Sequence, residues 1–306
     1  MLGLEVNAVE LTGHLRNLRG GSQPILARAS DGDSYVVKFA DNPQGPNLAF
    51  NESVGSALYR ACGLRTPEWK PLLLTDAFLD RNPASWMLSA EGARRPQAGW
   101  CFGSRYLGGN GERLLEILPG TSFQRISNLD SFWLAWLVDI CAGHADHRQA
   151  IFLPTAGGEL NAYFVDFGHL FAGPKGELHL PFQASRYLDA RIYARVSSQY
   201  LSEIHRIVRC IDAERLWQWV QTLPEDWKTA TALQEFARCM DRLGDASLVE
   251  STLETMLHAI EQGHRREQER RQDGREISLP VLRFGVQAAG LGQGIGGQCA
   301  GHLACA

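Results

Sequence analysis

The sequence of 306 residues predicts an α+β protein with two lobes, a small β-rich N-terminal lobe followed by a mainly helical C-terminal lobe. Near the N-terminus, the runs 23–29 and 34–39 are rich in strand-forming residues and enclose the turn Asp31-Gly32-Asp33. Between about residues 185 and 262, by contrast, apolar residues recur at helical spacing. A chain of this length can bury a separate core in each lobe.

The boundary between the lobes is expected at a cluster of glycines, 108–111, which has the composition of a hinge. We therefore assign residues 1–108 to the N-terminal lobe and 109–264 to the C-terminal lobe. After that point arginines alternate with acidic residues, and a glycine-rich stretch without apolar periodicity follows. Such a composition cannot offset the entropy lost on ordering, so 265–306 is predicted to be a disordered tail.

Composition narrows the class of protein. The hydrophobic content of 44% is that of an ordinary globular protein, and the formal net charge of −4 predicts neither a nucleic-acid partner nor an anionic membrane. No run approaches the roughly 20 apolar residues that cross a bilayer, and the N-terminus does not resemble a signal peptide. Seven dispersed cysteines without a CxxC pair predict reduced thiols. These features together predict a cytoplasmic protein.

Two helices are predicted from apolar spacing. The first follows the second strand, is capped by Gly63, and has the apolar positions Phe50, Val54, Ala57, Leu58 and Ala61. The second is more strongly apolar, with Leu129, Phe132, Trp133, Trp136, Leu137 and Ile140 on one face. Both are long enough and apolar enough to be core helices.

The second helix leads into the polar loop 143–149, which is dense in ionisable groups. Two short strands, 150–153 and 161–165, follow around a Gly-Gly turn, and the second ends in Asp166-Phe167-Gly168. The chain thus places a polar loop and an acidic turn at the two ends of one predicted hairpin.

Four ionisable residues appear in the order that a kinase requires. Lys38 lies on a strand and Glu52 on the next helix, whereas Asp146 follows a buried helix and Asp166 opens Asp-Phe-Gly. Phosphoryl transfer depends on positioning and charge stabilisation, so a lysine for the phosphates, a carboxylate for Mg²⁺ and a base must converge from distant segments. We assign Lys38 to phosphate, Asp166 to the metal and Asp146 to the base.

Each residue alone has an ordinary interpretation. Lys38 alone could face solvent, and Asp146 could belong to a salt-bridge cluster or to a metal site with His144 and His147. Glu52 lies about 180° from the apolar face of its helix at 100° per residue, but its own stripe of Leu48, Gly55 and Tyr59 is apolar or small. A helix buried on two sides fits a glutamate that faces a cleft, and we therefore predict an ion pair between Lys38 and Glu52.

Several stretches resemble the HipA-like kinases, a bacterial family with the two-lobed protein-kinase-like fold. They are Arg19-Gly20-Gly21-Ser22-Gln23-Pro24, Tyr35-Val36-Val37-Lys38-Phe39, Asn42-Pro43-Gln44, Asn51-Glu52, Cys62-Gly63-Leu64, Gly103-Ser104-Arg105-Tyr106, Ala145-Asp146-His147-Arg148-Gln149-Ala150-Ile151-Phe152 and Phe164-Val165-Asp166-Phe167-Gly168. The resemblance covers roughly residues 15–260. It implies ATP and Mg²⁺, a serine/threonine protein-kinase activity, a nucleotide-binding N-terminal lobe and a catalytic C-terminal lobe. The phosphate loop would be Gly20, Gly21, Ser22 and Gln23.

The sequence also departs from the general kinase pattern. The position five residues after Asp146, usually an asparagine that binds a second metal ion, is Ile151. Gln149 is the nearest amide and is assigned as the substitute metal ligand, as the resemblance implies. Two alternatives to a protein kinase remain: a pseudokinase that binds nucleotide without transferring phosphate, favoured by Ile151, and a small-molecule kinase of the aminoglycoside type. The sequence does not identify the acceptor hydroxyl.

Overall fold

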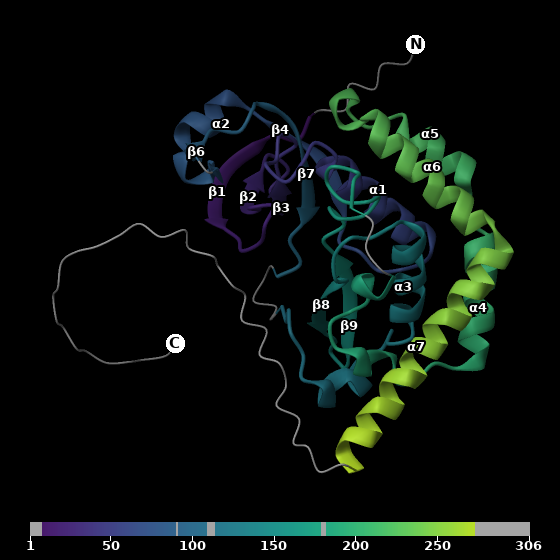
Figure 1. Ribbon diagram of the computed structural model, residues 1–306. Helices are drawn as coiled ribbons and strands as arrows, with labels where there is room; N and C mark the ends of the chain where they lie inside the picture. The colour runs from purple at the N-terminus through teal and green to yellow at the C-terminus, as the bar shows by residue number, and fades with distance from the viewer. Residues whose placement is uncertain (1–7, 90, 109–113, 179–181, 273–306) are drawn as a thin grey trace, which may run out of the picture. The chain divides into compact units, whose positions relative to one another are not determined.

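A computed structural model describes residues 8–89, 91–108, 114–178 and 182–272 (Figure 1). Residues up to Gln262 form one compact unit, to which the following paragraphs refer. Strands dominate its N-terminal part and helices its C-terminal part, which confirms the predicted α+β, two-lobed, kinase-like fold.

The N-terminal part is built on an antiparallel sheet of five strands in the order β1-β2-β3-β7-β4. Its strands are β1 Leu11–Asn17, β2 Ile25–Ala29, β3 Ser34–Lys38, β4 Trp69–Leu74 and β7 Gly99–Arg105. The predicted runs 23–29 and 34–39 correspond to β2 and β3, whereas β1 was not predicted. The short helix α2 Asp76–Arg81 and the hairpin of β5 Met87–Ser89 and β6 Gly92–Arg94 complete this part.

Helix α1, Leu48–Ala61, follows β3 as predicted. Eleven of its 14 residues are buried, because it contacts the sheet through β4 and β7 and packs Phe50 against Phe236 of a C-terminal helix. Gly63 has a φ of +76°, a left-handed conformation that glycine adopts without strain, and this confirms the predicted cap. A helix buried on most sides can hold a side chain rigidly.

The C-terminal part contains one central helix, one hairpin and a group of outer helices. These are α3 Ser131–Cys141, β8 Gln149–Pro154, β9 Leu160–Val165, α4 Ser198–Arg209, α5 Ala213–Val220, α6 Ala230–Gly244 and α7 Ala246–Gln272. The predicted apolar helix and hairpin are α3 and β8–β9, with shifts of one or two residues. Side chains of Ser197, Asp212 and Thr229 cap α4, α5 and α6 by accepting hydrogen bonds from backbone N–H groups.

Two sequence predictions, the glycine hinge and the disordered tail, fall partly on residues that the structure does not describe. The glycine cluster 108–111 lies almost wholly within 109–113, outside the described residues. Helix α7 continues to Gln272, so residues 265–272 of the predicted tail belong to this helix. Residues 273–306 lie outside the description.

Two further observations concern the described part of the chain. Its five cysteines are all free thiols. No helix within it has the length and apolar character needed to cross a membrane.

Candidate active site

Lys38 lies between two carboxylates that come from distant parts of the chain. Its Nζ donates a hydrogen bond to Oε1 of Glu52 and another, of 2.8 Å, to Oδ1 of Asp166. The lysine comes from the end of β3, the glutamate from α1 and the aspartate from the residue after β9. The predicted ion pair between Lys38 and Glu52 is therefore confirmed, and Asp166 joins it.

Burial sharpens the electrostatics of these three groups. Lys38 and Glu52 are only 6% and 2% exposed. Burial opposes charge on the amine, but the carboxylates of Asp166 and Glu52 outweigh it and raise the pKa of Lys38. Burial likewise opposes charge on Asp166, yet the lysine amine overcomes it and holds the pKa of Asp166 well below its ordinary value. Burial raises the pKa of Glu52. The result is a charged lysine beside an ionised Asp166.

Glu52 also binds the backbone of the segment that follows Asp166. Its Oε1 accepts a hydrogen bond of 2.8 Å from the backbone N–H of Gly168, and its Oε2 accepts one of 3.2 Å from Phe167. Gly168 leaves no space for a side chain there, because a Cβ would lie 2.5 Å from a methyl carbon of Leu48. One carboxylate therefore fixes both the lysine and the Asp-Phe-Gly turn.

The neighbouring Asn51 binds the same segment. Its buried Nδ2 donates to the backbone carbonyls of Gly168, Leu170 and Gly173 at 2.9, 2.8 and 3.2 Å. No role was predicted for Asn51 from the sequence, although its place directly before Glu52 was visible. Two consecutive side chains of α1 thus hold residues 167–173 through five hydrogen bonds to the backbone.

Asp166 itself has a left-handed backbone. Its φ is +62°, which is uncommon for a residue with a Cβ and costs free energy unless the surroundings enforce it. Its carbonyl and that of Val165 both accept hydrogen bonds from the buried guanidinium of Arg148. The side chain remains 32% exposed, so its carboxylate is accessible from solvent.

Asp146 lies in the loop between α3 and β8, next to the Asp-Phe-Gly segment. The backbone N–H of Ala145 donates a 2.8 Å hydrogen bond to the carbonyl of His169, which joins the two segments. Asp146 is partly exposed, and its Oδ1 accepts a 2.7 Å hydrogen bond from the backbone N–H of His147. The carboxylate of Asp146 is therefore partly exposed and follows directly after Ala145, the residue bonded to His169.

The alternative metal site of Asp146 with two histidines does not form. His144 is buried, with its Nδ1 3.3 Å from Oδ2 of Asp139, and burial lowers its pKa. His147 is exposed and approaches the carbonyl of Arg186. Within the described ranges, no three His, Cys, Asp or Glu side chains are grouped so as to hold a metal ion.

The predicted phosphate loop forms the turn between β1 and β2. Gly20 has a φ of +139°, a conformation that favours glycine, and Gly21 lies next to the side-chain amide of Gln44. The side chain of Gln23 forms two hydrogen bonds with the backbone of Leu88, donating at 2.8 Å and accepting at 2.6 Å. That amide is thus occupied in attaching the turn to β5, while Ser22 is buried and its carbonyl accepts from Asn42.

The donor set fits a magnesium ion that is completed by a nucleotide. Mg²⁺ prefers hard oxygen ligands and is often held by one or two carboxylates together with phosphates and water. Asp166 offers an ionised, partly exposed carboxylate. Gln149 is exposed and pairs with Val165 across the hairpin, beside Asp166, whereas Ile151 pairs with Tyr163 further along. Of the two positions, it is therefore Gln149, and not Ile151, that lies beside Asp166.

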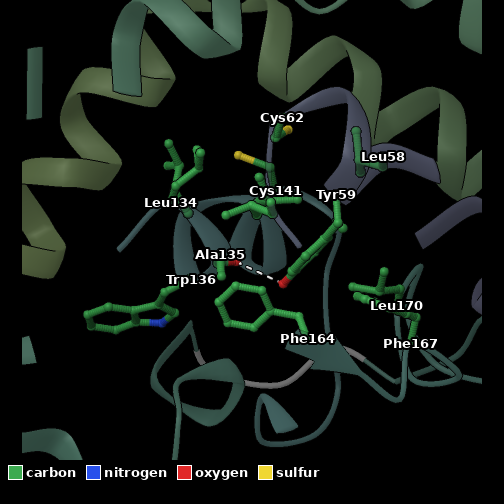
Figure 2. Packing of buried hydrophobic residues seen from close by; sticks show 14 of the residues in the cluster. Leu58, Tyr59, Cys62, Leu134, Ala135, Trp136, Cys141, Phe164, Phe167 and Leu170 are labelled. Carbon is green, nitrogen blue, oxygen red and sulfur yellow. Dashed lines mark hydrogen bonds between the residues drawn. The ribbon is translucent and has the colours of Figure 1, made fainter. Parts of the chain in front are cut away.

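A buried polar cluster supports the site and was not predicted from the sequence. The hydroxyl of Tyr59 donates to Oδ1 of Asp139 at 2.6 Å. It also lies 3.1 Å from the carbonyl oxygen of Ala135, the contact drawn as a dashed line in Figure 2. Nη1 of Arg148 approaches the same Tyr59 hydroxyl and Asp139 carboxylate at 3.2 and 3.3 Å. The available signal was Asp139 itself, an acid within an otherwise apolar helix.

The N-terminal sheet, the mainly helical C-terminal part and these side chains together have the arrangement of a kinase-like fold. A scan against models of known protein families found no match, and a search of curated proteins found none.

The chain is similar to solved structures of kinases. One is a proinflammatory kinase, CtkA, from Helicobacter pylori, with a TM-score of 0.49 and 12% identity over 76% of this chain and 94% of the other. A Golgi casein kinase with Mn/ADP bound gives a TM-score of 0.44 at 12% identity, covering 81% and 73%. A second structure of the Golgi casein kinase gives 0.46 at 11% identity, with the same coverage.

Proposed function

We propose that this protein is an ATP-dependent phosphotransferase that moves the γ-phosphate of Mg-ATP to a hydroxyl group. The observation that carries the proposal is the position of the Lys38 amine, buried between the carboxylates of Glu52 and Asp166. A buried lysine paired with two acids could simply stabilise the fold. An apolar side chain or a surface ion pair would stabilise the fold equally well, so stability alone does not account for burying these charges. The left-handed backbone of Asp166 at the same place favours a functional site.

Each side chain then has a role that follows from its chemistry. Lys38 neutralises phosphate oxygens, and Glu52 holds the amine in place. Asp166 and Gln149 hold Mg²⁺, which when bound would neutralise charge on the phosphates. The turn Gly20–Gln23 presents its backbone to the phosphates, since the Gln23 amide is bonded to Leu88.

Asp146 is proposed to act on the acceptor. Its carboxylate would orient the attacking hydroxyl and take its proton, which is the task of a general base in phosphoryl transfer. Its partial exposure leaves it accessible to an incoming hydroxyl group. The resemblance to HipA-like kinases favours a serine or threonine hydroxyl of a protein as the acceptor, with ATP as the donor.

The proposal is tested by incubating the protein with labelled ATP and Mg²⁺ and locating incorporated phosphate by mass spectrometry. We expect Lys38→Met to lower transfer by at least about 10²-fold, because a charge that stabilises the phosphates is lost. Lys70→Met is the matched control, since Lys70 of β4 also pairs with an aspartate, Asp31 in the turn between β2 and β3, but is partly exposed. Circular dichroism checks folding, and Lys38→Met combined with Glu52→Gln removes both charges if the single variant does not fold. Equal transfer by the folded Lys38 variant and the wild type would reject the site.

A pseudokinase is the second candidate, and the position of Ile151 favours it. Ile151 lies within β8 opposite Tyr163, where it cannot bind a metal ion. Tight binding of Mg-ATP by the wild-type protein, measured by calorimetry, without transfer to itself or to a mixture of protein and aminoglycoside acceptors would favour this candidate over the first.

A further inference from the structure

Arg148 is the most deeply buried arginine side chain near the candidate site. Its side chain has no solvent exposure, although a guanidinium is costly to desolvate unless its donors are satisfied. It lies two residues after Asp146, in the loop that leads into β8. No role has been assigned to it so far beyond its hydrogen bonds.

One side of the guanidinium holds the residue proposed to bind the metal. Nη2 donates to the carbonyl of Val165 at 2.8 Å and to that of Asp166. These are the two peptide units at which β9 ends and the backbone turns into the left-handed conformation of Asp166. The two hydrogen bonds favour this conformation over the extended one that would continue the strand.

The other side of the guanidinium is fixed by the buried cluster. Nη1 contacts the Tyr59 hydroxyl and the Asp139 carboxylate, and the guanidinium carbon lies 4.7 Å from the ring centre of Phe167 and 5.4 Å from that of Tyr59. These partners come from α1, α3 and the Asp-Phe-Gly segment. The planar group therefore has little freedom to rotate.

The backbone of Arg148 holds its own loop as well. Its N–H donates to the carbonyl of Arg186 at 3.3 Å, while Ala145 of the same loop is bonded to His169. Arg148 thus connects the loop that carries Asp146 to the turn that carries Asp166.

We propose that Arg148 is a positioning residue that sets the separation between Asp146 and Asp166 by gripping the carbonyls of residues 165 and 166. This inference rests on the proposed function, because the separation matters only if one carboxylate acts on the acceptor and the other on the metal. Because its side chain has no solvent exposure, Arg148 acts through the backbone of Asp166 and not on substrate or metal directly.

A simpler role must be separated from this one. Arg148 also neutralises Asp139, so removing the arginine leaves a buried, uncompensated carboxylate, and the protein would lose stability for that reason alone. Combining Arg148→Met with Asp139→Asn removes the two charges together. The amide introduced by Asp139→Asn keeps an oxygen that can accept from Tyr59, whereas the carbonyls of residues 165 and 166 lose their donor.

The experiment compares Arg148→Met, the double variant Arg148→Met with Asp139→Asn, and Arg125→Met. Arg125 is the matched control, because it donates to the carbonyl of Gly158 at the opposite end of the same β8–β9 hairpin and is exposed. Thermal unfolding gives the stability of each protein. The transfer assay gives kcat, the KM for ATP and the Mg²⁺ concentration at half-maximal rate.

We expect the double variant to regain much of the stability lost by Arg148→Met, while its kcat stays about 10²-fold below that of the wild type, the loss expected for a small misplacement of reacting groups. Its half-maximal Mg²⁺ concentration should rise, and Arg125→Met should match the wild type. Recovery of kcat together with stability would show that Arg148 only balances charge and would overturn the inference.

The failure of the proposed function gives a different pattern. If the wild type transfers no phosphate but binds Mg-ATP, the double variant must bind Mg-ATP more weakly than the wild type, and equal binding overturns the inference about Arg148. If the wild type neither transfers phosphate nor binds Mg-ATP, the proposed function is wrong and the inference fails with it.

Discussion

Oε1 of Glu52 lies 2.8 Å from the backbone nitrogen of Gly168, 116 residues further along the chain, and accepts its hydrogen bond. The same oxygen accepts from the amine of Lys38. A single carboxylate oxygen thus couples the lysine of the sheet to the turn that carries Asp166. Lys38 and Asp166 cannot be positioned independently of α1.

Glu52→Gln removes the negative charge of this side chain and keeps its size and shape. We expect transfer to fall by about 10²-fold, because Lys38 loses a charged partner and shifts. Stability should change little, because burial already opposes the charge of Glu52, as its raised pKa indicates, and an amide oxygen can still accept from Gly168. Urea unfolding beside the transfer assay measures both quantities.

The control for this substitution is Glu235→Gln. Glu235 is also a buried glutamate with a basic partner, Arg238, but it belongs to α6. It should leave transfer unchanged. If Glu52→Gln transfers phosphate at the wild-type rate, the charge of Glu52 is not needed to position Lys38 for the reaction.

Asp146 and Asp166 should have separable effects. Asp146→Ala should retain much of the affinity for ATP while transfer falls by roughly 10²-fold or more, the range for loss of a general base. Asp166→Ala should lose Mg²⁺-dependent nucleotide binding as well as transfer. Calorimetric titration with ATP, circular dichroism and the labelled-ATP assay on both variants measure this difference. Transfer by Asp146→Ala at the wild-type rate would reject Asp146 as the base.

Gly55 in the middle of α1 gives a test in which two physical effects have opposite signs. Alanine favours a helix over glycine by about 1 kcal/mol. A Cβ at this position, however, would lie 2.5 Å from a methyl carbon of Leu170 and 2.6 Å from Cβ of Phe167. We expect the clash to dominate, so that Gly55→Ala lowers stability by about 1–3 kcal/mol and reduces transfer.

Gly244→Ala is the matched control, because a Cβ on Gly244, the last residue of α6, would meet no atom within 4 Å. It should be neutral or slightly stabilising. Thermal unfolding of the two variants compares them directly, and a stabilised Gly55→Ala would mean that the Asp-Phe-Gly segment is not packed against α1.

The site residues that could be predicted from the sequence are those whose residue type and order along the chain fit a known chemical role. Lys38, Glu52 and Asp166 were found because a strand lysine, a helix glutamate and an Asp-Phe-Gly turn occur in a fixed order. The hydrogen bond of Arg148 to Tyr59 joins residues 89 positions apart, and no periodicity or local motif reports such a contact. For Gln23 the residue type suited a phosphate loop, but the sequence did not indicate that its side-chain amide is bonded to Leu88.

The buried His144 predicts how stability depends on pH. Burial lowers its pKa below the ordinary value of 6.5 in the folded protein, despite the nearby Asp139. The unfolded chain therefore binds a proton more readily, so the free energy of unfolding should decrease as the pH falls below about 6.5. In His144→Gln this part of the pH dependence should be absent.

Urea unfolding between pH 5 and 8 measures the dependence. His258→Gln, which changes a histidine of α7 that is not buried, is the control and should retain the wild-type slope. A slope that is the same in wild type and His144→Gln would contradict the prediction.

The five backbone hydrogen bonds that Asn51 and Glu52 make with residues 167–173 determine how this protein could be switched. These contacts use four hydrogens, so at about 1 kcal/mol net for each, moving α1 away from that segment costs at least about 4 kcal/mol. The displaced helix would then occur in no more than roughly one molecule in several hundred, since each 1.4 kcal/mol is a factor of ten. An inhibitor or partner that worked by pulling the helix outward would have to supply that free energy from its own binding. A molecule that blocked access to Asp146 and Asp166 would break none of these bonds and would not have to supply that free energy.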